Sequence, residues 1–318
     1  MKNLKIMLFL SMMLPAAEGC GSRTAAAADT PQPPKVYFTR EITPESLVRI
    51  YKALDRKAEG KVAVKISTGE PGGHNYLKPA LIGDLVRMLN GTIVECNTAY
   101  DGGRNTTGAH KITMERHGWV KAADVDILDE TDDMELAVPC GKVIKKNYVG
   151  AHLADYDSLL VLTHFKGHPM GGFGGALKNI SIGIASSRGK QYIHGAGDMD
   201  KFWDSDHDSF LESMADAAWS VHDRFQGKQA YINVMKNMSV DCDCCAVAAD
   251  PKIGDIGILA CLDPVALDQA CLDLVYQSDD SGKGDLIERI ESLHGVHTVE
   301  AAADLGIGSR EYELVELD

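Results

Sequence analysis

The chain of 318 residues carries a formal charge of −14, and 45% of its residues are hydrophobic. A surplus of acidic side chains this large argues against nucleic acid or anionic lipid as the main partner. The length is sufficient for one large domain or for two tightly joined lobes.

The first residues have the pattern of a secretory signal peptide. Lys2 and Lys5 precede an apolar stretch, Ile6–Leu14, which is too short to span a bilayer and is followed by small residues. Cleavage before Cys20 would leave a cysteine for lipid attachment, whereas cleavage further along would give simple secretion. We therefore predict a signal peptide over residues 1–19 and an exported protein of the periplasm or cell envelope, with a lipid anchor at Cys20 as its only membrane contact.

Residues 20–34 are rich in Ala, Ser, Thr and Pro and predict a flexible linker, so the folded domain is expected over residues 35–318. Apolar runs predict strands at Val36–Thr39, Val62–Ile66, Thr92–Cys96, Val125–Leu128, Ser158–Leu162, Ala230–Met235 and Ile256–Leu259. Amphipathic stretches predict helices at Pro44–Arg56, Pro79–Leu89, Thr107–His117, Phe210–Phe225 and from Asp263 onward. This alternation indicates an α/β fold, a mainly parallel sheet with helices on both faces.

Polar, glycine-containing loops follow three of the predicted strands. Because the carboxyl ends of parallel strands lie at one edge of a sheet, these loops are expected to face one crevice, although each alone is also typical of an ordinary turn. A strand-like stretch, Gln191–Ile193, would return a further histidine to the same crevice. The residues predicted to bind a ligand or cofactor are Glu70, Gly72, Gly73, His74, Asn97, Arg104, Gly171, Gly172, Gly174, Gly175 and His194.

The third of these loops, residues 163–178, combines two histidines, two lysines and five glycines. Glycines at this density let backbone approach a ligand, and the predicted catalytic residues are His164, Lys166, His168 and Lys178. The spacing matches neither a phosphate-binding loop nor a dinucleotide fingerprint. A glycine-rich turn with solvated basic residues is the alternative. The other histidines are expected at the surface or at helix ends, namely His110, His117, His152, His222, His294 and His297.

A cysteine-rich stretch lies between the last two predicted strands. Two thiols separated by one residue, with aspartates beside them, suit a soft cation, so the predicted metal ligands are Cys242, Cys244, Asp241 and Asp243. A structural disulfide among the cysteines of residues 242–245 is the alternative in an exported protein. Cys96, Cys261 and Cys271 stand in apolar contexts and are expected to be core residues.

From Val36 to Leu317 the chain resembles the domain of unknown function 362 family, often labelled uncharacterised iron-sulfur centre proteins. The segments that carry the resemblance are Val64–Pro79, Glu95–Thr107, His164–Ile180 and Asp241–Cys244. The resemblance implies an iron-sulfur or other transition-metal centre. Many relatives hold a ferredoxin-like, four-cysteine insert where residues 194–207 lie in this chain. That stretch contains no cysteine, so the usual cluster has no ligands in this segment.

Three functions remain open at this point. The first is a metal or iron-sulfur related oxidoreductase for a small molecule, with Cys242 and Cys244 joined by His164 or His168 and with a redox partner. The second is a histidine- and lysine-based isomerase or racemase, since residues 164–178 are distantly similar to a run in lactate racemase, whose nickel-pincer cofactor is held by lysine and histidine. The third is a binding protein without turnover that captures an anionic small molecule.

Overall fold

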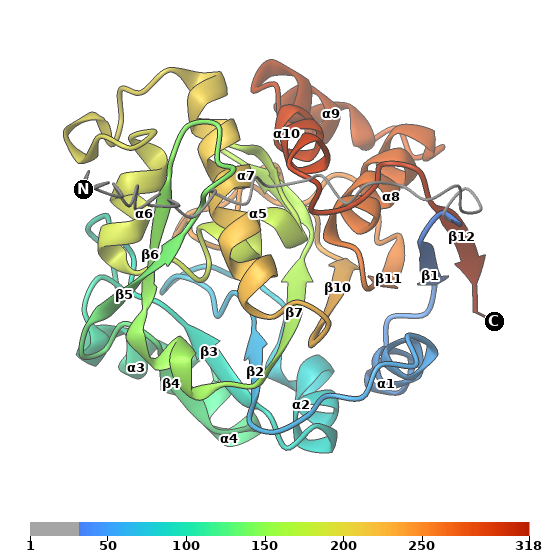
Figure 1. Ribbon diagram of the computed structural model, residues 1–318. Helices are drawn as coiled ribbons and strands as arrows, with labels where there is room; N and C mark the ends of the chain where they lie inside the picture. Colours follow the sequence, from blue (N-terminus) through green and yellow to red (C-terminus); the bar gives the residue numbers. More distant parts are fainter. Residues whose placement is uncertain (1–31, 318) are drawn as a thin grey trace, which may run out of the picture.

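The central sheet has eight strands in the order β12-β1-β11-β10-β7-β2-β3-β4 (Figure 1). The computed structural model describes residues 32–317, so the predicted signal peptide and Cys20 lie outside the described residues, as does most of the linker. The strands are β1 (Lys35–Thr39), β2 (Val62–Lys65), β3 (Thr92–Glu95), β4 (Val125–Ile127), β7 (Ser158–His164), β10 (Gln229–Met235), β11 (Gly257–Cys261) and β12 (Glu313–Glu316).

All strands of this sheet run parallel except β11, which pairs antiparallel with both β1 and β10. The predicted α/β fold with a mainly parallel sheet is therefore confirmed. Each predicted strand forms within a few residues of its expected bounds. The sequence prediction missed the edge strand β12 and two short pairs, β5 (Asp133–Ala137) with β6 (Lys146–Gly150) and β8 (Lys166–His168) with β9 (Gly172–Gly174).

Helices cover both faces of the sheet. One face carries α1 (Pro44–Ala53), α2 (Pro79–Met88), α3 (Thr107–Arg116) and α4 (Trp119–Ala122); the other carries α5 (Ala176–Ser181), α7 (His207–Arg224), α8 (Pro264–Gln277) and α10 (His297–Asp304) (Figure 1). In β7, Leu159 and Val161 belong to one core and Leu160 and Leu162 to the other. A strand buried on both faces has a continuous run of apolar residues, which is why the sequence predicted β7 so clearly.

The remaining helices are α6 (Ser187–His194) and α9 (Lys283–Ser292), with 3-10 turns at Ala151–Asp155 and Met199–Lys201. The prediction of a strand-like stretch at Gln191–Ile193 is wrong, because these residues lie in α6. The Ser186 side chain caps that helix by accepting a hydrogen bond from the Gly189 amide at 3.0 Å. Within the described residues, no helix has the length and apolar character that crossing a membrane requires.

The chain changes direction across the sheet between two neighbouring strands, β2 and β7. From β2 it continues outward to β3 and β4, whereas from β7 it continues the other way to β10. The loops that leave β2 and β7 at their carboxyl ends therefore diverge and leave a crevice. In open α/β sheets this is the point where ligands bind.

Candidate functional site

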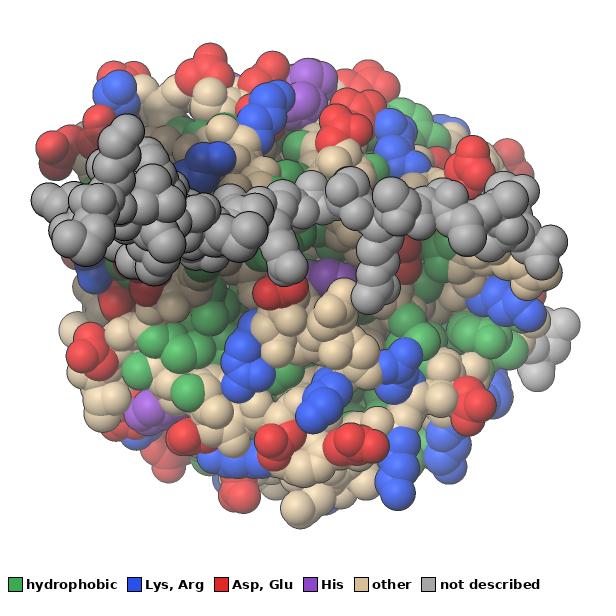
Figure 2. All heavy atoms as spheres, viewed as in Figure 1, with side chains coloured by type: hydrophobic (Ala, Val, Ile, Leu, Met, Phe, Trp, Pro, Cys, Tyr) green, Lys and Arg blue, Asp and Glu red, His purple; other side chains and the backbone are tan. Residues whose placement is uncertain are grey.

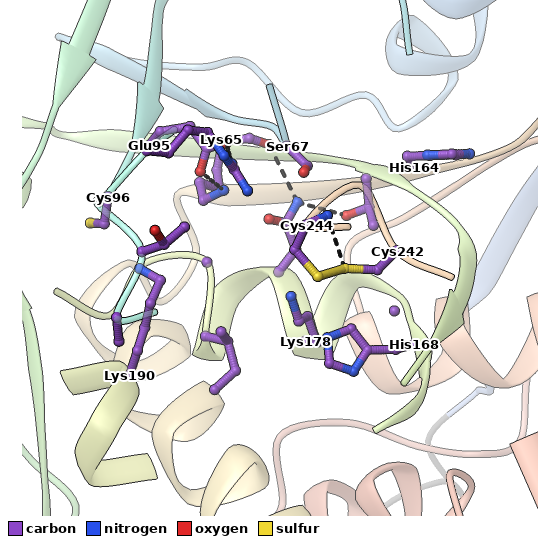
Figure 3. A pocket seen from close by; sticks show the side chains of 18 of the residues that line it. Lys65, Ser67, Glu95, Cys96, His164, His168, Lys178, Lys190, Cys242 and Cys244 are labelled. Carbon is purple, nitrogen blue, oxygen red and sulfur yellow. Dashed lines mark hydrogen bonds and ion pairs between the residues drawn. A yellow bond between two sulfur atoms is a disulfide. The ribbon is translucent and has the colours of Figure 1, made fainter. Parts of the chain in front are cut away.

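A cavity occupies this crevice at the carboxyl ends of β2, β3 and β7 (Figure 3). It encloses about 760 Å³ of empty space, part of which is open to solvent. Its lining includes Lys65, Ser67, Glu95, Cys96, Tyr100, Arg104, Thr163, His164, Lys166, His168, Gly174, Gly175, Lys178, Asn179, Lys190, His194, Phe202, Cys242 and Cys244. The cavity thus brings together loops that are far apart in the sequence.

A buried ionic network forms one wall. Lys65 Nζ lies 3.0 Å from Glu95 Oε2, and Arg104 contacts Glu95 Oε1 at 3.3 Å and Glu70 Oε2 at 2.7 Å. The Thr68 amide also donates to Glu95 at 2.8 Å. Burial pushes the pKa of Glu95 upward, but Lys65 and Arg104 outweigh it and hold that pKa at about 2. Glu70 and Arg104, predicted to bind a cofactor, are thus each other's partners.

A second ion pair fixes the cysteine loop to the end of β7. Asp243 Oδ1 lies 2.8 Å from His164 Nδ1, and Asp243 Oδ2 lies 3.2 Å from Lys166 Nζ. Burial raises the pKa of the Asp243 carboxyl, but His164 and Lys166 overcome this and hold it well below its usual range. The second ring nitrogen of His164 donates to the Lys236 carbonyl at 2.6 Å. Both ring nitrogens of His164 are therefore engaged, and this side chain serves to hold the loop.

Lys178 differs from the other cations of the cavity. Within residues 32–317, its ammonium has no hydrogen-bond or ion-pair partner, whereas Lys65 and Lys166 pair with carboxylates and Lys190 Nζ donates to the Ala185 carbonyl at 2.5 Å. Burial, together with repulsion from Lys166, Lys65 and Lys190, lowers the pKa of Lys178 to about 7. About half of the Lys178 side chains are then free amines at neutral pH.

The position of Lys178 follows from how α5 begins. The buried Asp268 carboxylate of α8 accepts hydrogen bonds from the amides of Ala176 and Leu177 at 2.7 and 2.9 Å, and from Asn233 Nδ2 at 2.7 Å. A carboxylate at a helix N-terminus satisfies amides that have no partner within the helix. A Cβ at Gly175 would collide with this carboxylate, so glycine is required there for packing. The short helix then directs Lys178 into the cavity (Figure 3).

Two histidines of the cavity differ in their hydrogen-bonding groups: one has a donor and the other an acceptor at Nε2. Nδ1 of His168 accepts hydrogen bonds from the amides of Met170 and Gly171, so Nε2 carries the proton and is a donor. Nδ1 of His194 donates to the Lys190 carbonyl at 2.7 Å, so its Nε2 keeps a lone pair. Burial lowers the pKa of His168 well below its ordinary value and that of His194 to about 4. Both rings are therefore neutral at physiological pH.

Cys242 and Cys244 form a disulfide that lines the cavity. Their sulfur atoms and a ring nitrogen of His168 lie within 4.8 Å of one another, an arrangement compatible with a metal centre. In the disulfide form the sulfurs lack the thiolate charge that binds metal, and His168 directs a protonated nitrogen away from the backbone. The donor set therefore does not fit a metal in this form. A four-thiolate cluster does not fit either, because the described lining holds three cysteines and the cluster needs four. The third of them, Cys96, is engaged as well, since its thiol donates to the Ile184 carbonyl.

The other two predicted metal ligands lie apart from this group. Asp243 is engaged by His164 and Lys166, and Asp241 accepts from the Ala249 amide at 3.0 Å and pairs with Arg289 at 3.5 Å. Cys96, Cys261 and Cys271 are buried as expected. Burial raises the pKa of each of these three thiols, that of Cys261 to about 12, so they stay protonated.

Of the residues singled out in the sequence, the structure places His164, Lys166, His168, Lys178, His194, Arg104, Gly174, Gly175 and both cysteines of the disulfide in the lining of the cavity. Several other predicted binding residues lie outside the lining, namely Glu70, Gly72, Gly73, His74, Asn97, Gly171 and Gly172. His74 is exposed and pairs with Asp250, and Asn97 contacts the ring of His110 at 3.3 Å. Gly172 has a φ of +75° and packs against Gly295, which explains its lack of a side chain.

Sequence reasoning placed one histidine wrongly and missed three charged residues of the cavity. His110 is not at the surface: it is fully buried, which lowers its pKa to about 3. Lys65 and Glu95 end apolar strands, and Lys190 lies in a helix that was not predicted. A charged residue at the end of a strand buried on both faces is the signal that could have found Lys65 and Glu95, because such residues are almost never buried without a partner.

The cavity is cationic although the chain is acidic. Lys65, Lys166, Lys178, Lys190 and Arg104 line it, while the carboxylates that neutralise them are those of Glu95, Asp243 and, behind Arg104, Glu70. On the face seen in Figure 2, acidic and basic side chains are interspersed. A local excess of positive charge with low-dielectric walls attracts anions.

Solved structures of known proteins show distant similarity to this chain. One is the lactate racemase apoprotein from Thermoanaerobacterium thermosaccharolyticum, with 17% identity and a TM-score of 0.39, covering 62% of this chain and 50% of that one. Another is a protein from Thermotoga maritima, with 11% identity and a TM-score of 0.42, covering 82% of this chain and 59% of that one. This chain thus matches between half and three fifths of their lengths, and similarity of this size carries no argument about function. No curated protein matches significantly.

A family model agrees with the resemblance noted in the sequence. Residues 62–273 match the model described as domain of unknown function (DUF362). The matched range runs from β2 to α8 and includes every residue named above as lining the cavity. The protein therefore belongs to the family of the domain of unknown function 362.

Proposed function

We propose that this protein is an enzyme that binds a small anionic molecule in the cavity and transfers a proton with the Lys178 amine. The observation that carries the proposal is the unpaired Lys178 among paired cations, within residues 32–317. A lysine whose amine is free near neutral pH is suited to act as a general base. The surrounding cations would bind the anionic group of the substrate, most simply a carboxylate.

The proposed chemistry is proton transfer at a carbon next to that carboxylate, the reaction of an isomerase or racemase. Lys178 would accept the proton from carbon, and the Nε2–H of His168 would donate a hydrogen bond to the oxygen on which negative charge develops. The lone pair on His194 Nε2 would provide a second proton acceptor within the same cavity. Lys166 and Lys190 would favour the anion electrostatically.

This proposal predicts that the protein binds small anions and that it exchanges a carbon-bound hydrogen of its substrate for deuterium. Phosphate and malonate should raise the melting temperature of the full-length protein more than chloride does at equal ionic strength. Small 2-hydroxy and 2-amino acids, incubated with the protein in deuterium oxide, should include one that gains deuterium at carbon 2, measured by proton NMR.

The variant that tests the assignment is Lys178→Met, which should abolish exchange while leaving the protein folded. Lys111→Met is the matched control, because Lys111 is exposed and pairs with Glu130. The proposal of an anion site is wrong if neither phosphate nor malonate stabilises the protein. The role of Lys178 is wrong if its Met variant exchanges deuterium at the wild-type rate.

A second candidate function is metal binding by the reduced protein, favoured by the proximity of His168 to the two sulfur atoms. Reduction would supply two thiolates, which with imidazole suit zinc, copper or iron. Elemental analysis should then find about one metal per chain after anaerobic reduction and none in the disulfide form. The Cys242→Ser/Cys244→Ser variant should lose that metal, and full metal content in this variant would exclude the cysteines as ligands.

A further inference from the structure

We infer that the Cys242–Cys244 disulfide is a redox centre that exchanges with a small anionic thiol bound in the cavity. The inference rests on the proposed anion site and adds a reaction to it. Both sulfur-bearing side chains line the cavity, on the side facing Lys178 and His168 (Figure 3). A disulfide that serves only to hold a fold needs no contact with a ligand cavity, whereas exchange requires access for the attacking thiolate.

The two sulfurs differ in ways that set the direction of attack. Cys242 is 2% exposed, while Cys244 is more accessible. The Cys244 amide donates a hydrogen bond to Cys242 Sγ at 3.1 Å, which stabilises negative charge on that sulfur. Because exchange is faster when the leaving sulfur is a stabilised thiolate, the incoming thiolate attacks Cys244 Sγ and Cys242 leaves.

The residue between the cysteines keeps the loop in place when the bond opens. The Asp243 side chain pairs with His164 and Lys166, and its carbonyl oxygen accepts a hydrogen bond from the Glu70 amide at 2.9 Å. These contacts do not involve either sulfur, so reduction leaves them intact. The two thiols would therefore stay close together and ready to re-form the disulfide.

Charge in the cavity selects the thiol. Lys178, Lys166 and Lys190 line the same space and favour a thiol that carries a carboxylate or sulfonate. The same cations stabilise the thiolates that form on reduction. In its free-amine form, Lys178 can also take the proton from the incoming thiol, and it is then a cation like its neighbours. Cys245, by contrast, is not part of the lining, and burial together with Asp241 raises the pKa of its thiol.

The reaction is balanced by two molecules of the anionic thiol. The first thiolate forms a bond to Cys244 Sγ, the bond between the two cysteines breaks, and Cys242 leaves as a thiolate. The second thiolate attacks the ligand sulfur of this mixed disulfide and releases Cys244. Two thiols are thereby oxidised to one small-molecule disulfide, and the protein disulfide takes up two electrons and two protons. The same two steps in reverse, starting from the small-molecule disulfide, oxidise the two cysteines of the protein.

The test compares two thiols of similar size and opposite charge on the full-length protein. Mercaptoethanesulfonate and cysteamine are supplied anaerobically at equal thiolate concentrations, and free thiols are alkylated and located by mass spectrometry of the peptide that contains Cys242 and Cys244. The anionic thiol should reduce this disulfide about tenfold faster, and the preference should weaken at high salt. A short peptide containing a cystine loop gives the intrinsic reactivity of each thiol.

Variants assign the preference to the cavity. Lys178→Met and Lys190→Gln should each reduce it, whereas Lys252→Gln should not, because Lys252 is exposed and pairs with Asp285. Cys245→Ser should leave the rate unchanged, since this cysteine has no part in the exchange. The inference is wrong if the disulfide resists both thiols until the protein is unfolded, or if the rates, corrected by the peptide, do not depend on charge.

The outcome also separates this inference from the proposed function. If malonate stabilises the protein but the disulfide does not react, the exchange reaction is wrong and the anion site remains. If neither malonate nor thiol charge has an effect, both are wrong. The Cys242→Ser/Cys244→Ser variant should still bind malonate but should lose all thiol–disulfide exchange. That result would show that anion binding and disulfide exchange use different groups of the same cavity.

Discussion

Acetic anhydride is expected to acetylate Lys178 with a pH midpoint near 7, far below that of an ordinary lysine. Burial and the neighbouring cations lower the pKa of Lys178 to about 7. Relative to an ordinary lysine, whose pKa is about 10.4, this increases the free-amine fraction at neutral pH by roughly a thousandfold. Competitive labelling over a range of pH, followed by mass spectrometry of the peptide that contains Lys178, measures the midpoint directly.

The direction of the effect follows from the charges around Lys178. The groups that act on its charge are Lys166, Lys65 and Lys190, which favour the neutral amine, and Glu95, which favours the cation; the neighbouring His168 ring is neutral. Labelling should therefore be slow at acidic pH, rise through about pH 7 and then level off. Lys190→Gln removes a repulsive charge and should move the midpoint upward. A midpoint near 10 in the wild-type protein would contradict the assignment of Lys178 as the base.

Glu95→Gln is expected to lower the free energy of unfolding by about 3–5 kcal/mol, the cost of breaking a buried ion pair. The carboxylate of Glu95 accepts hydrogen bonds from Thr68 and contacts both Lys65 and Arg104 within 3.3 Å. Glutamine keeps the size but leaves Lys65 without a counter-charge in a site that water scarcely reaches. Urea unfolding at neutral pH measures the loss.

The ion pairs of Glu95 also predict how the stability of the protein depends on pH. The folded protein holds the pKa of Glu95 at about 2, below that of an exposed glutamate, because Lys65 and Arg104 outweigh the effect of burial. Its stabilising contribution is therefore fully present above about pH 4.5 and is lost as the pH falls toward 2. Glu130→Gln is the control, since its exposed pair with Lys111 should be worth at most about 1 kcal/mol. A loss for Glu95→Gln no larger than this control would show that the network is not stabilising.

The central strands could be predicted because burial on both faces leaves a direct mark on sequence. Successive residues of β7 alternate between the two cores on opposite faces of the sheet, so the strand is apolar without interruption. The short hairpin of β8 and β9 left no such mark, because Lys166, Gly167 and Gly174 have little β-propensity and are held by tertiary contacts. A Cβ at Gly167 would collide with the Val240 backbone, which shows that close packing, and not a ligand, requires that glycine.

The position of the candidate site could be predicted from the sequence, but the ion pairs within it could not. The rule that ligands bind at the carboxyl ends of parallel strands placed the loop of Lys178 at the crevice. Which charges neutralise each other depends on contacts between distant segments, such as Asp243 with His164 or Glu70 with Arg104. Once these pairs are known, Lys178 remains as the unpaired lysine of the described cavity, a distinction that spacing alone does not reveal.

The placement of β1 has a consequence for how the chain folds. This first strand lies between β11 and β12, so its backbone partners are Ile258–Ala260 on one edge and Glu313–Glu316 on the other. The first edge cannot be completed until residue 260 has been synthesised, and the second cannot be completed until residue 316 has been. Such long-range pairing gives a high contact order and slows folding, since a large loop must close before the contacts form. A chain assembled in this way stays open to proteases and chaperones until its last strand docks.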